Sequence, residues 1–149
     1  MSKTVRLKNY LNVFEEMVAG GVITPGHLVK LASTGKVIAH DDANENALPM
    51  FALEDELQGK TIAQTYAENA PVQVWIPTRG DQVYAILAAN ETVAIGDFVA
   101  SNGDGTLKKH VEDAESGGLL TVHGKQIVGQ ALEAKVTSAA TARIKVRIV

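Results

Sequence analysis

Cysteine is missing from the 149-residue chain, so disulfide bonds, thiolate metal sites and cysteine nucleophiles are all excluded. No uninterrupted apolar run approaches the roughly 20 residues that a membrane-spanning helix needs. A basic excess is missing as well, because 14 Lys and Arg stand against 17 Asp and Glu, for a net charge of -3. Nucleic-acid-binding domains normally carry a basic face. We therefore expect no nucleic-acid partner and no membrane association.

The N-terminus also lacks the apolar core of a signal peptide, since "MSKTVRLKNY" is polar. The protein is therefore expected to act in the compartment where it is made. Hydrophobic residues make up 46% of the chain and charged residues 21%, which is typical of a globular protein. Without disulfides, its stability must come from packing or from assembly.

Short β-like runs are what the chain has in quantity after Gly20 and Gly21. They are bounded by glycine, proline, asparagine and aspartate, a pattern that predicts antiparallel strands and turns. The runs are "HLVKLA", "KVIAH", "VQVWIP", "QVYAILA", "DFVAS", "LLTVHG" and "ARIKVRIV". Residues 52–70 lack this pattern, and either a helical turn or a long loop fits them. We predict a mainly β fold in which residues 22–149 form one domain.

A repeat is visible at a fixed offset of 70 residues. "VITPGHLVKLASTGKVIAH" from Val22 aligns without gaps on "TVAIGDFVASNGDGTLKKH" from Thr92. The matches include Gly26 with Gly96 and Gly35 with Gly105, where glycine suits a tight turn. An internal duplication, with pseudo-repeats 22–77 and 92–149, explains the pattern. Two such units around one core predict a small antiparallel β-barrel, β-tulip or β-clip-like fold.

The stretch "NGDG" at residues 102–105 resembles part of a calcium loop. Its counterpart in the first repeat, Ala32 to Gly35, has no carboxylate. A complete calcium loop also needs several more oxygen ligands and a closing bidentate glutamate, but Leu107, Lys108 and Lys109 follow here. We interpret the stretch as a hairpin turn and expect no metal site.

Other candidate chemistry is equally sparse. The run Glu54-Asp55-Glu56 has no partner at a catalytic spacing and is typical of a solvated loop. The histidines, which form no zinc motif, are expected at the surface or in turns; they are His27, His40, His110 and His123. No serine lies in a G-x-S-x-G context. The Arg-Gly-Asp within "PTRGD" is interpreted as a bend between strands. We expect neither enzymatic activity nor a cofactor.

Residues 1–21 differ in character from the rest and are predicted to form an N-terminal arm. Lys3, Arg6 and Lys8 make its start basic. Apolar residues then recur at spacings of three and four, as on one face of a short helix; they are Tyr10, Leu11, Phe14, Met17 and Val18. This arm is either a first element folded onto the core or a segment that packs on a partner. In the second case, the body should keep its fold without it.

Taken together, these segments resemble the head decoration, or cement, proteins of tailed bacteriophages. The similarity covers roughly residues 3–135 and rests on the order of the segments. They are the basic arm, a glycine-led first strand, a Y-x-x-N-x-x-V step from Tyr66, and the "GDFVASNGDGTL" hairpin. The resemblance implies a β-barrel or β-tulip subunit, made in the bacterial cytoplasm, that sits on the outer surface of the virion capsid and stabilises the shell.

The resemblance also implies partners. These are the major capsid protein and further copies of the chain, as a homotrimer in preference to a dimer. The arm is expected to bind the capsid through Lys3, Arg6, Lys8, Tyr10, Leu11 and Phe14. An alternative of a different class stays open: a β-clip module that binds a small, carbohydrate-like molecule, or an enzyme with a cryptic site in the loop 52–70.

Overall fold

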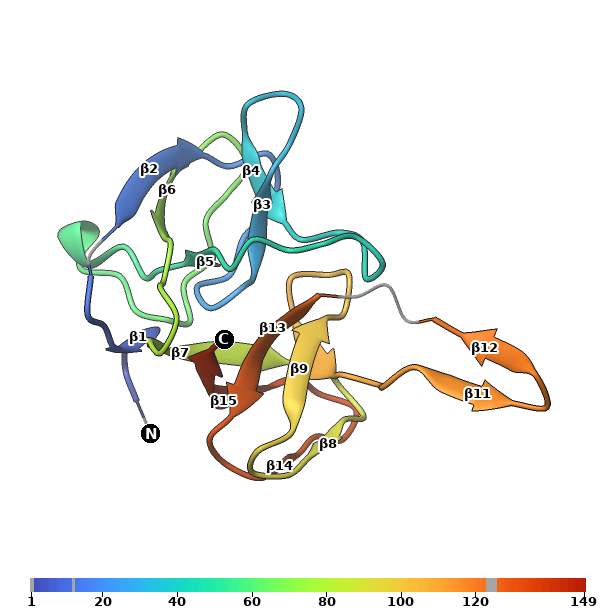
Figure 1. Cartoon of the computed structure of the whole chain (residues 1–149). Coiled ribbons are helices and arrows are strands. Elements are labelled where there is room, and N and C mark those ends of the chain that lie inside the picture. Colours follow the sequence, from blue (N-terminus) through green and yellow to red (C-terminus); the bar gives the residue numbers. More distant parts are fainter. Residues whose placement is uncertain (1, 12, 123–125) are drawn as a thin grey trace.

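A computed structural model describes residues 2–11, 13–122 and 126–149. His123, which was expected at the surface or in a turn, lies outside the described residues. The regular secondary structure of the described residues is nearly all β (Figure 1). The strands are β1 (Arg6–Lys8), β2 (Phe14–Val18), β3 (Val29–Leu31), β4 (Val37–Ala39), β5 (Phe51–Ala52), β6 (Pro71–Trp75), β7 (Gln82–Leu87), β8 (Thr92–Val93), β9 (Phe98–Ser101), β10 (Leu107–Lys109), β11 (Ala114–Ser116), β12 (Leu119–Thr121), β13 (Ile127–Ala131), β14 (Lys135–Val136) and β15 (Ala142–Ile148).

The largest sheet closes into a barrel. Its six strands follow the order β1-β7-β10-β9-β13-β15, and β15 also pairs with β7. Strands β7, β10, β9, β13 and β15 therefore form the barrel, and β1 is added to β7 outside it. The pairs are antiparallel except β10 with β7, which run parallel where Leu107 meets Leu87. Closure leaves few unpaired edges, and the predicted small β-barrel fold is confirmed.

The barrel interior is filled by alternate residues of its strands. On β15, Ile144, Val146 and Ile148 are buried, while the intervening Lys145 and Arg147 are exposed. This period of two is the one that a strand imposes on its side chains. Trp75 and Phe51 extend this core toward the N-terminal half, and both are fully buried.

A second layer covers one side of the barrel. It contains the sheet β2-β6-β5 and the hairpin β3–β4, packed around a smaller core that includes Ile23 and Tyr66. Two backbone hydrogen bonds join the halves, from Leu28 N–H to the Gly105 carbonyl (2.8 Å) and from Gly105 N–H to the His40 carbonyl (3.0 Å).

The two hairpins occupy matching positions at the offset found in the sequence. The offset of 70 places β4 on β10, residue for residue, and β3 on the last three residues of β9. Gly26 and Gly96 both have positive φ, of 96° and 90°, and so do Gly35 and Gly105, of 79° and 84°. Only glycine adopts this conformation at little cost. The same turn chemistry therefore serves both halves.

The helix predicted over residues 10–18 is wrong, because Phe14–Val18 form strand β2. This strand pairs with β6, with Phe14 opposite Trp75 and Val18 opposite Pro71. Tyr10, Phe14 and Val18 are four residues apart, a spacing that is compatible with a helix but is also a multiple of the strand period of two. The available edge of β6 decided between the two conformations. In the segment 52–70, the short 3-10 helix η1 (Glu56–Gln58) is flanked by loops.

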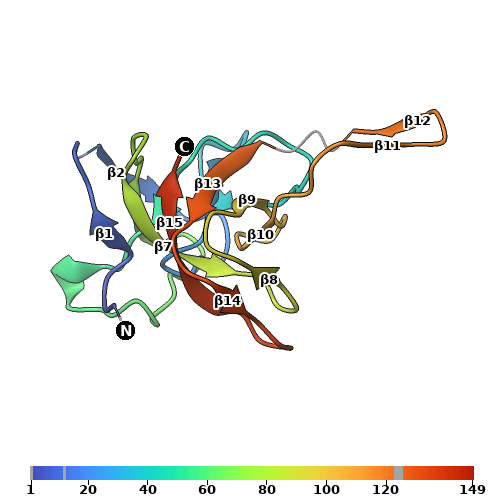
Figure 2. The same ribbon diagram turned by 60° about the horizontal axis from the view of Figure 1, so that its bottom comes forward.

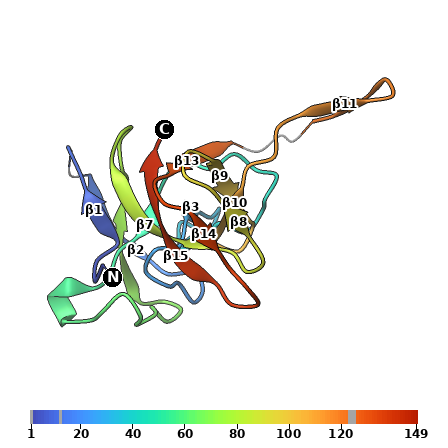
Figure 3. The ribbon, with the colours of Figure 1, turned by 90° about the horizontal axis from the view of Figure 1, so that it is seen from below.

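Strands β11 and β12 form a hairpin that stands away from the body. Figures 1, 2 and 3 show it projecting on the side opposite β1 and the N-terminus. Within the described residues, no helix is long and apolar enough to cross a membrane.

Candidate functional site

The N-terminal segment that carries the predicted binding residues is hydrogen-bonded to the body. Strand β1 pairs with β7, and β2 pairs with β6. Val5 and Ala19 are fully buried, and the Val5 N–H donates to the Glu54 carboxylate at 3.1 Å. The segment therefore displays its exposed side chains from fixed backbone positions. Glu54 is itself buried, because its carboxylate holds the residue that precedes β1. The prediction of a solvated loop is therefore wrong for this residue.

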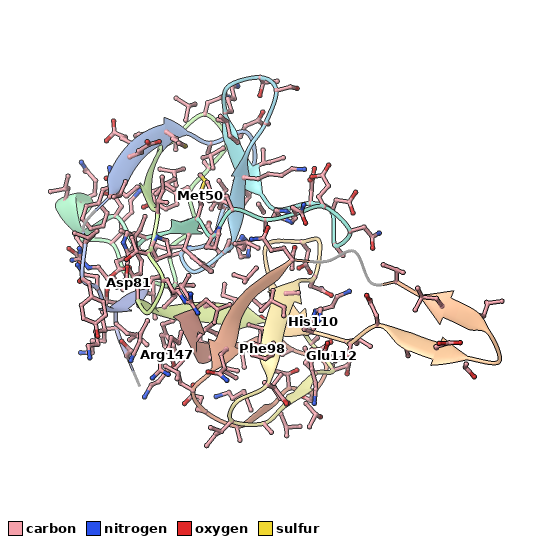
Figure 4. The ribbon with its side chains drawn as sticks, in the orientation of Figure 1. Met50, Asp81, Phe98, His110, Glu112 and Arg147 are labelled. Atoms are coloured by element: carbon pink, nitrogen blue, oxygen red, sulfur yellow. The ribbon has the colours of Figure 1, made fainter. Side chains whose placement is uncertain are left out.

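The turn at Arg-Gly-Asp holds the same segment in place. Asp81 is fully buried, and its carboxylate accepts hydrogen bonds from the Tyr10 N–H (2.8 Å), the Thr78 N–H (2.8 Å) and the Thr78 hydroxyl (3.1 Å). Figure 4 shows Asp81 beside the N-terminal segment. The predicted bend between β6 and β7 is confirmed, and its aspartate has a structural role.

Arg6 and Phe14 form one part of the candidate site. The Arg6 guanidinium lies 5.0 Å from the centroid of the Phe14 ring, a distance at which a cation and a ring attract each other. Both residues line a groove of about 160 Å³, together with Leu53, Glu54 and Leu57. A neighbouring hollow of about 520 Å³ shares Glu54 with this groove and is lined by Lys3 as well. Arginine, aromatic and aliphatic side chains thus surround a concave surface.

Lys8 and Tyr10 form a second part, further along the segment. The Lys8 ammonium lies 5.4 Å from the Tyr10 ring, and Tyr10 and Leu11 are among the most exposed large side chains of the chain. The structure thus places Arg6 and Phe14 in the groove and Lys3 in the neighbouring hollow, and Lys8 and Tyr10 line neither.

A cationic surface adjoins Lys8 that sequence reasoning missed. Lys8 and Arg147 both pair with Gln82 of β7, from its two sides, so they occupy one row of the sheet. Gly80 donates to the Ile148 carbonyl at 2.9 Å, which brings Arg79 close to the end of β15. We call Lys8, Arg79, Lys145 and Arg147 the cationic face; all four are exposed, and within the described residues none belongs to an ion pair. The alternation of Arg143, Lys145 and Arg147 in "ARIKVRIV" was the available signal.

Arg143, in contrast, is half-buried against the barrel. Its guanidinium donates to the Ile62 carbonyl at 2.7 Å and lies 5.9 Å from the Tyr84 ring. Burial lowers the pKa of Arg143, and the charges of Tyr84 and Glu54 partly offset this effect. Arg143 thus ties the loop 52–70 to the barrel and takes no part in the cationic face.

The stretch 102–105 is a turn, as predicted. The Asp104 carboxylate accepts hydrogen bonds from both the backbone N–H and the hydroxyl of Thr106. Burial raises the pKa of Asp104, but the hydrogen bonds from Thr106 and Asn102 and the charge of His27 outweigh it, so that the net shift is downward. In the described ranges, no three His, Cys, Asp or Glu side chains form a group that could hold a metal ion.

The prediction of surface or turn histidines is wrong for His40. Its ring is fully buried between the two repeat hairpins, and its Nδ1 lies 2.7 Å from the Ser101 hydroxyl. The pair is closed to solvent, which a nucleophilic serine site would not be. His27 lies in the turn before β3, where its Nδ1 accepts from the Thr24 N–H at 3.3 Å, and burial lowers its pKa.

Comparison with known proteins finds a likeness in structure. No family model and no curated protein sequence matches the chain. The fold is similar to the crystal structure of the N base of the head fiber gp8.5 of bacteriophage phi29, with a TM-score of 0.56 and 13% sequence identity. The alignment covers 93% of this chain and 95% of that one. At this identity the likeness defines the fold, over nearly the full length of both chains.

Proposed function

We propose that the protein is a structural component of a tailed-phage virion that binds the outer surface of the head and stabilises the shell. The observation that carries the proposal is the full-length fold likeness to a head-fiber base. The order of sequence segments supports it independently. In this proposal the partners are the major capsid protein and further copies of the chain, as a homotrimer, and no catalysis is involved.

Attachment to the capsid occurs through the N-terminal segment. Its basic and aromatic side chains are held on a rigid β framework, so few of their degrees of freedom remain to be lost on binding. Arginine and aromatic residues often dominate protein interfaces. Arg6 and Phe14 at the groove are the central pair, with Lys3, Lys8, Tyr10 and Leu11 around them. Because several copies bind a repeating lattice, weak single contacts add up to stable decoration.

The double substitution Arg6→Ala/Phe14→Ala tests this attachment. Both side chains project from strands without filling the core, so the fold should persist while capsid binding falls by at least 10-fold. Co-sedimentation of purified protein with undecorated heads measures the binding, and circular dichroism checks the fold.

Lys108→Ala/Phe98→Ala is a matched control, since Phe98 is 38% exposed and Phe14 is 40% exposed, and Phe98 lies on the barrel strand β9. This control should bind heads like the unmodified protein. Undiminished decoration by the Arg6/Phe14 variant would rule out the proposed attachment.

A small-molecule site is the second candidate, and the hollow beside the loop 52–70 favours it. Glu54, Glu56, Lys60 and Thr61 line this space of about 520 Å³, which is within the range of ligand sites. A carbohydrate that binds there, and whose binding Glu56→Ala abolishes, would support this candidate over capsid attachment.

A further inference from the structure

The β11–β12 hairpin lacks support from the rest of the molecule. In the part of the chain that the structure describes, β11 pairs with β12 alone, and the two form a separate sheet. All three ribbon views show the hairpin clear of the barrel (Figures 1, 2 and 3). An isolated two-stranded hairpin is marginally stable in water. The hairpin therefore needs a surface to pack on.

Each face of this hairpin carries one exposed leucine. Leu119 and Leu120 are 75% and 64% exposed, and neighbouring residues of a strand point to opposite faces. Val111 and Val122 add to the exposed apolar surface near its base. A hairpin that exposes a leucine on each face is suited to burial against another protein surface.

The charge of the hairpin has one sign. Residues 111–122 contain Glu112, Asp113 and Glu115 and no lysine or arginine. Glu112 lies at its base, with an oxygen 3.8 Å from His110 Nε2 (Figure 4). Acidic side chains beside exposed apolar ones are complementary to a basic surface that also carries apolar groups.

The chain itself carries such a surface on its other side. The cationic face has the opposite charge, and the exposed side chains of Tyr10, Leu11 and Val149 lie on the adjoining segments. Strand β1 and the hairpin lie at opposite ends of the molecule (Figures 2 and 3). The hairpin of one molecule therefore cannot reach its own cationic face, whereas that of a second copy can.

We propose that the β11–β12 hairpin of one copy docks on the cationic face of the next. Such a head-to-tail contact joins two different surfaces and forms a closed ring when its rotation is a simple fraction of a turn. The inference rests on the self-association included in the proposed function. The contact shares Lys8, Tyr10 and Leu11 with the proposed capsid attachment and leaves its central pair, Arg6 and Phe14, free. In the first repeat, the offset of 70 places the loop that leads into β5 where the hairpin stands, so the hairpin has no counterpart in the first repeat.

Charge reversal tests the contact in the full-length protein, with molar mass from size-exclusion chromatography and multi-angle light scattering. We expect the unmodified protein to be an oligomer. Glu112→Lys/Glu115→Lys should weaken association at least 10-fold, and so should Arg79→Glu/Arg147→Glu, because each places like charges together. All four substitutions combined should restore the oligomer. Glu15→Lys/Glu68→Lys, which changes the net charge as much as the first pair on other exposed sites, should leave assembly unchanged.

Leu119→Ser/Leu120→Ser probes the apolar part without any change of charge. Both residues are solvent-exposed, so the circular dichroism spectrum should stay as in the unmodified protein while the oligomer dissociates. If the reversed and serine variants all assemble as the unmodified protein does, or if the fourfold variant stays dissociated, the contact is wrong. A monomer at every concentration would overturn both the contact and self-association, while head co-sedimentation still decides capsid attachment separately.

Discussion

At the scale of single residues, polar side chains fix turns and segments. Asp81 gathers the Tyr10 and Thr78 donors in the interior, and Glu54 holds the Val5 N–H. Removal of either partner leaves the other buried without a hydrogen bond, which lowers the free energy of unfolding by about 1–3 kcal/mol or more. The acidic residues that suggested chemistry in the sequence thus act as structural acceptors.

Asp104 provides a test at this scale. Asp104→Ala should lower the free energy of unfolding by about 0.5–1.5 kcal/mol at pH 7, because the hydrogen bonds to Thr106 are lost. The folded-state pKa of Asp104 is lowered, so its contribution is present above its unfolded value of 3.8 and is lost as the pH falls through the lower folded value. Urea denaturation at several pH values measures the difference between the two proteins.

A chelator should leave both proteins unchanged, since the carboxylate serves a turn. A melting temperature that falls by several degrees with chelator in the unmodified protein, but not in Asp104→Ala, would contradict the turn interpretation.

At the scale of elements, β13 approaches β15 so closely at Gly129 that a larger side chain has no room there. Gly129 pairs with Ile148, and a Cβ at Gly129 would lie 2.3 Å from Val146 Cγ1 and 2.7 Å from the Arg147 carbonyl oxygen. Glycine in a strand often marks such an approach of another backbone. The barrel therefore depends on a residue that hydrophobic patterning does not reveal.

Gly129→Ala should accordingly lower the free energy of unfolding by about 1–3 kcal/mol, because the strands must separate to admit the methyl group. Thermal unfolding by circular dichroism measures the loss. Gly21→Ala is the control, since a Cβ at Gly21 meets no atom within 4 Å, and it should melt close to the unmodified protein. Equal melting temperatures for all three proteins would show that the barrel relaxes around the methyl group.

At the scale of the whole molecule, the N-terminal segment is part of the folded body. It adds β1 to the edge of β7 and β2 to the edge of β6, and it buries Val5 in the main core. The opposite end carries the acidic, apolar hairpin. The molecule thus presents a basic and aromatic end and an acidic end.

Deletion of residues 1–18 should therefore destabilise the body. Loss of Val5 alone removes about 1.5–3 kcal/mol of apolar burial, and two strand edges become exposed. We expect a lower and broader thermal transition than that of the full chain. A truncated protein with an unchanged melting temperature would instead support the separable arm that the sequence suggested.

The sequence by itself determined the class of fold and the turns. Period-two alternation in "ARIKVRIV", glycines at Gly26, Gly35, Gly96 and Gly105, and the offset of 70 led to a β-barrel with matched hairpins, because strand periodicity and positive φ are local properties. Tertiary structure decided the conformation of Phe14–Val18, since a spacing of four fits helix and strand alike and only the edge of β6 chose between them. It also decided the burial of Glu54 and His40 and the union of Lys8, Arg79 and Arg147 in one face. These depend on strand pairs that join residues far apart in the chain, and no local pattern encodes such contacts.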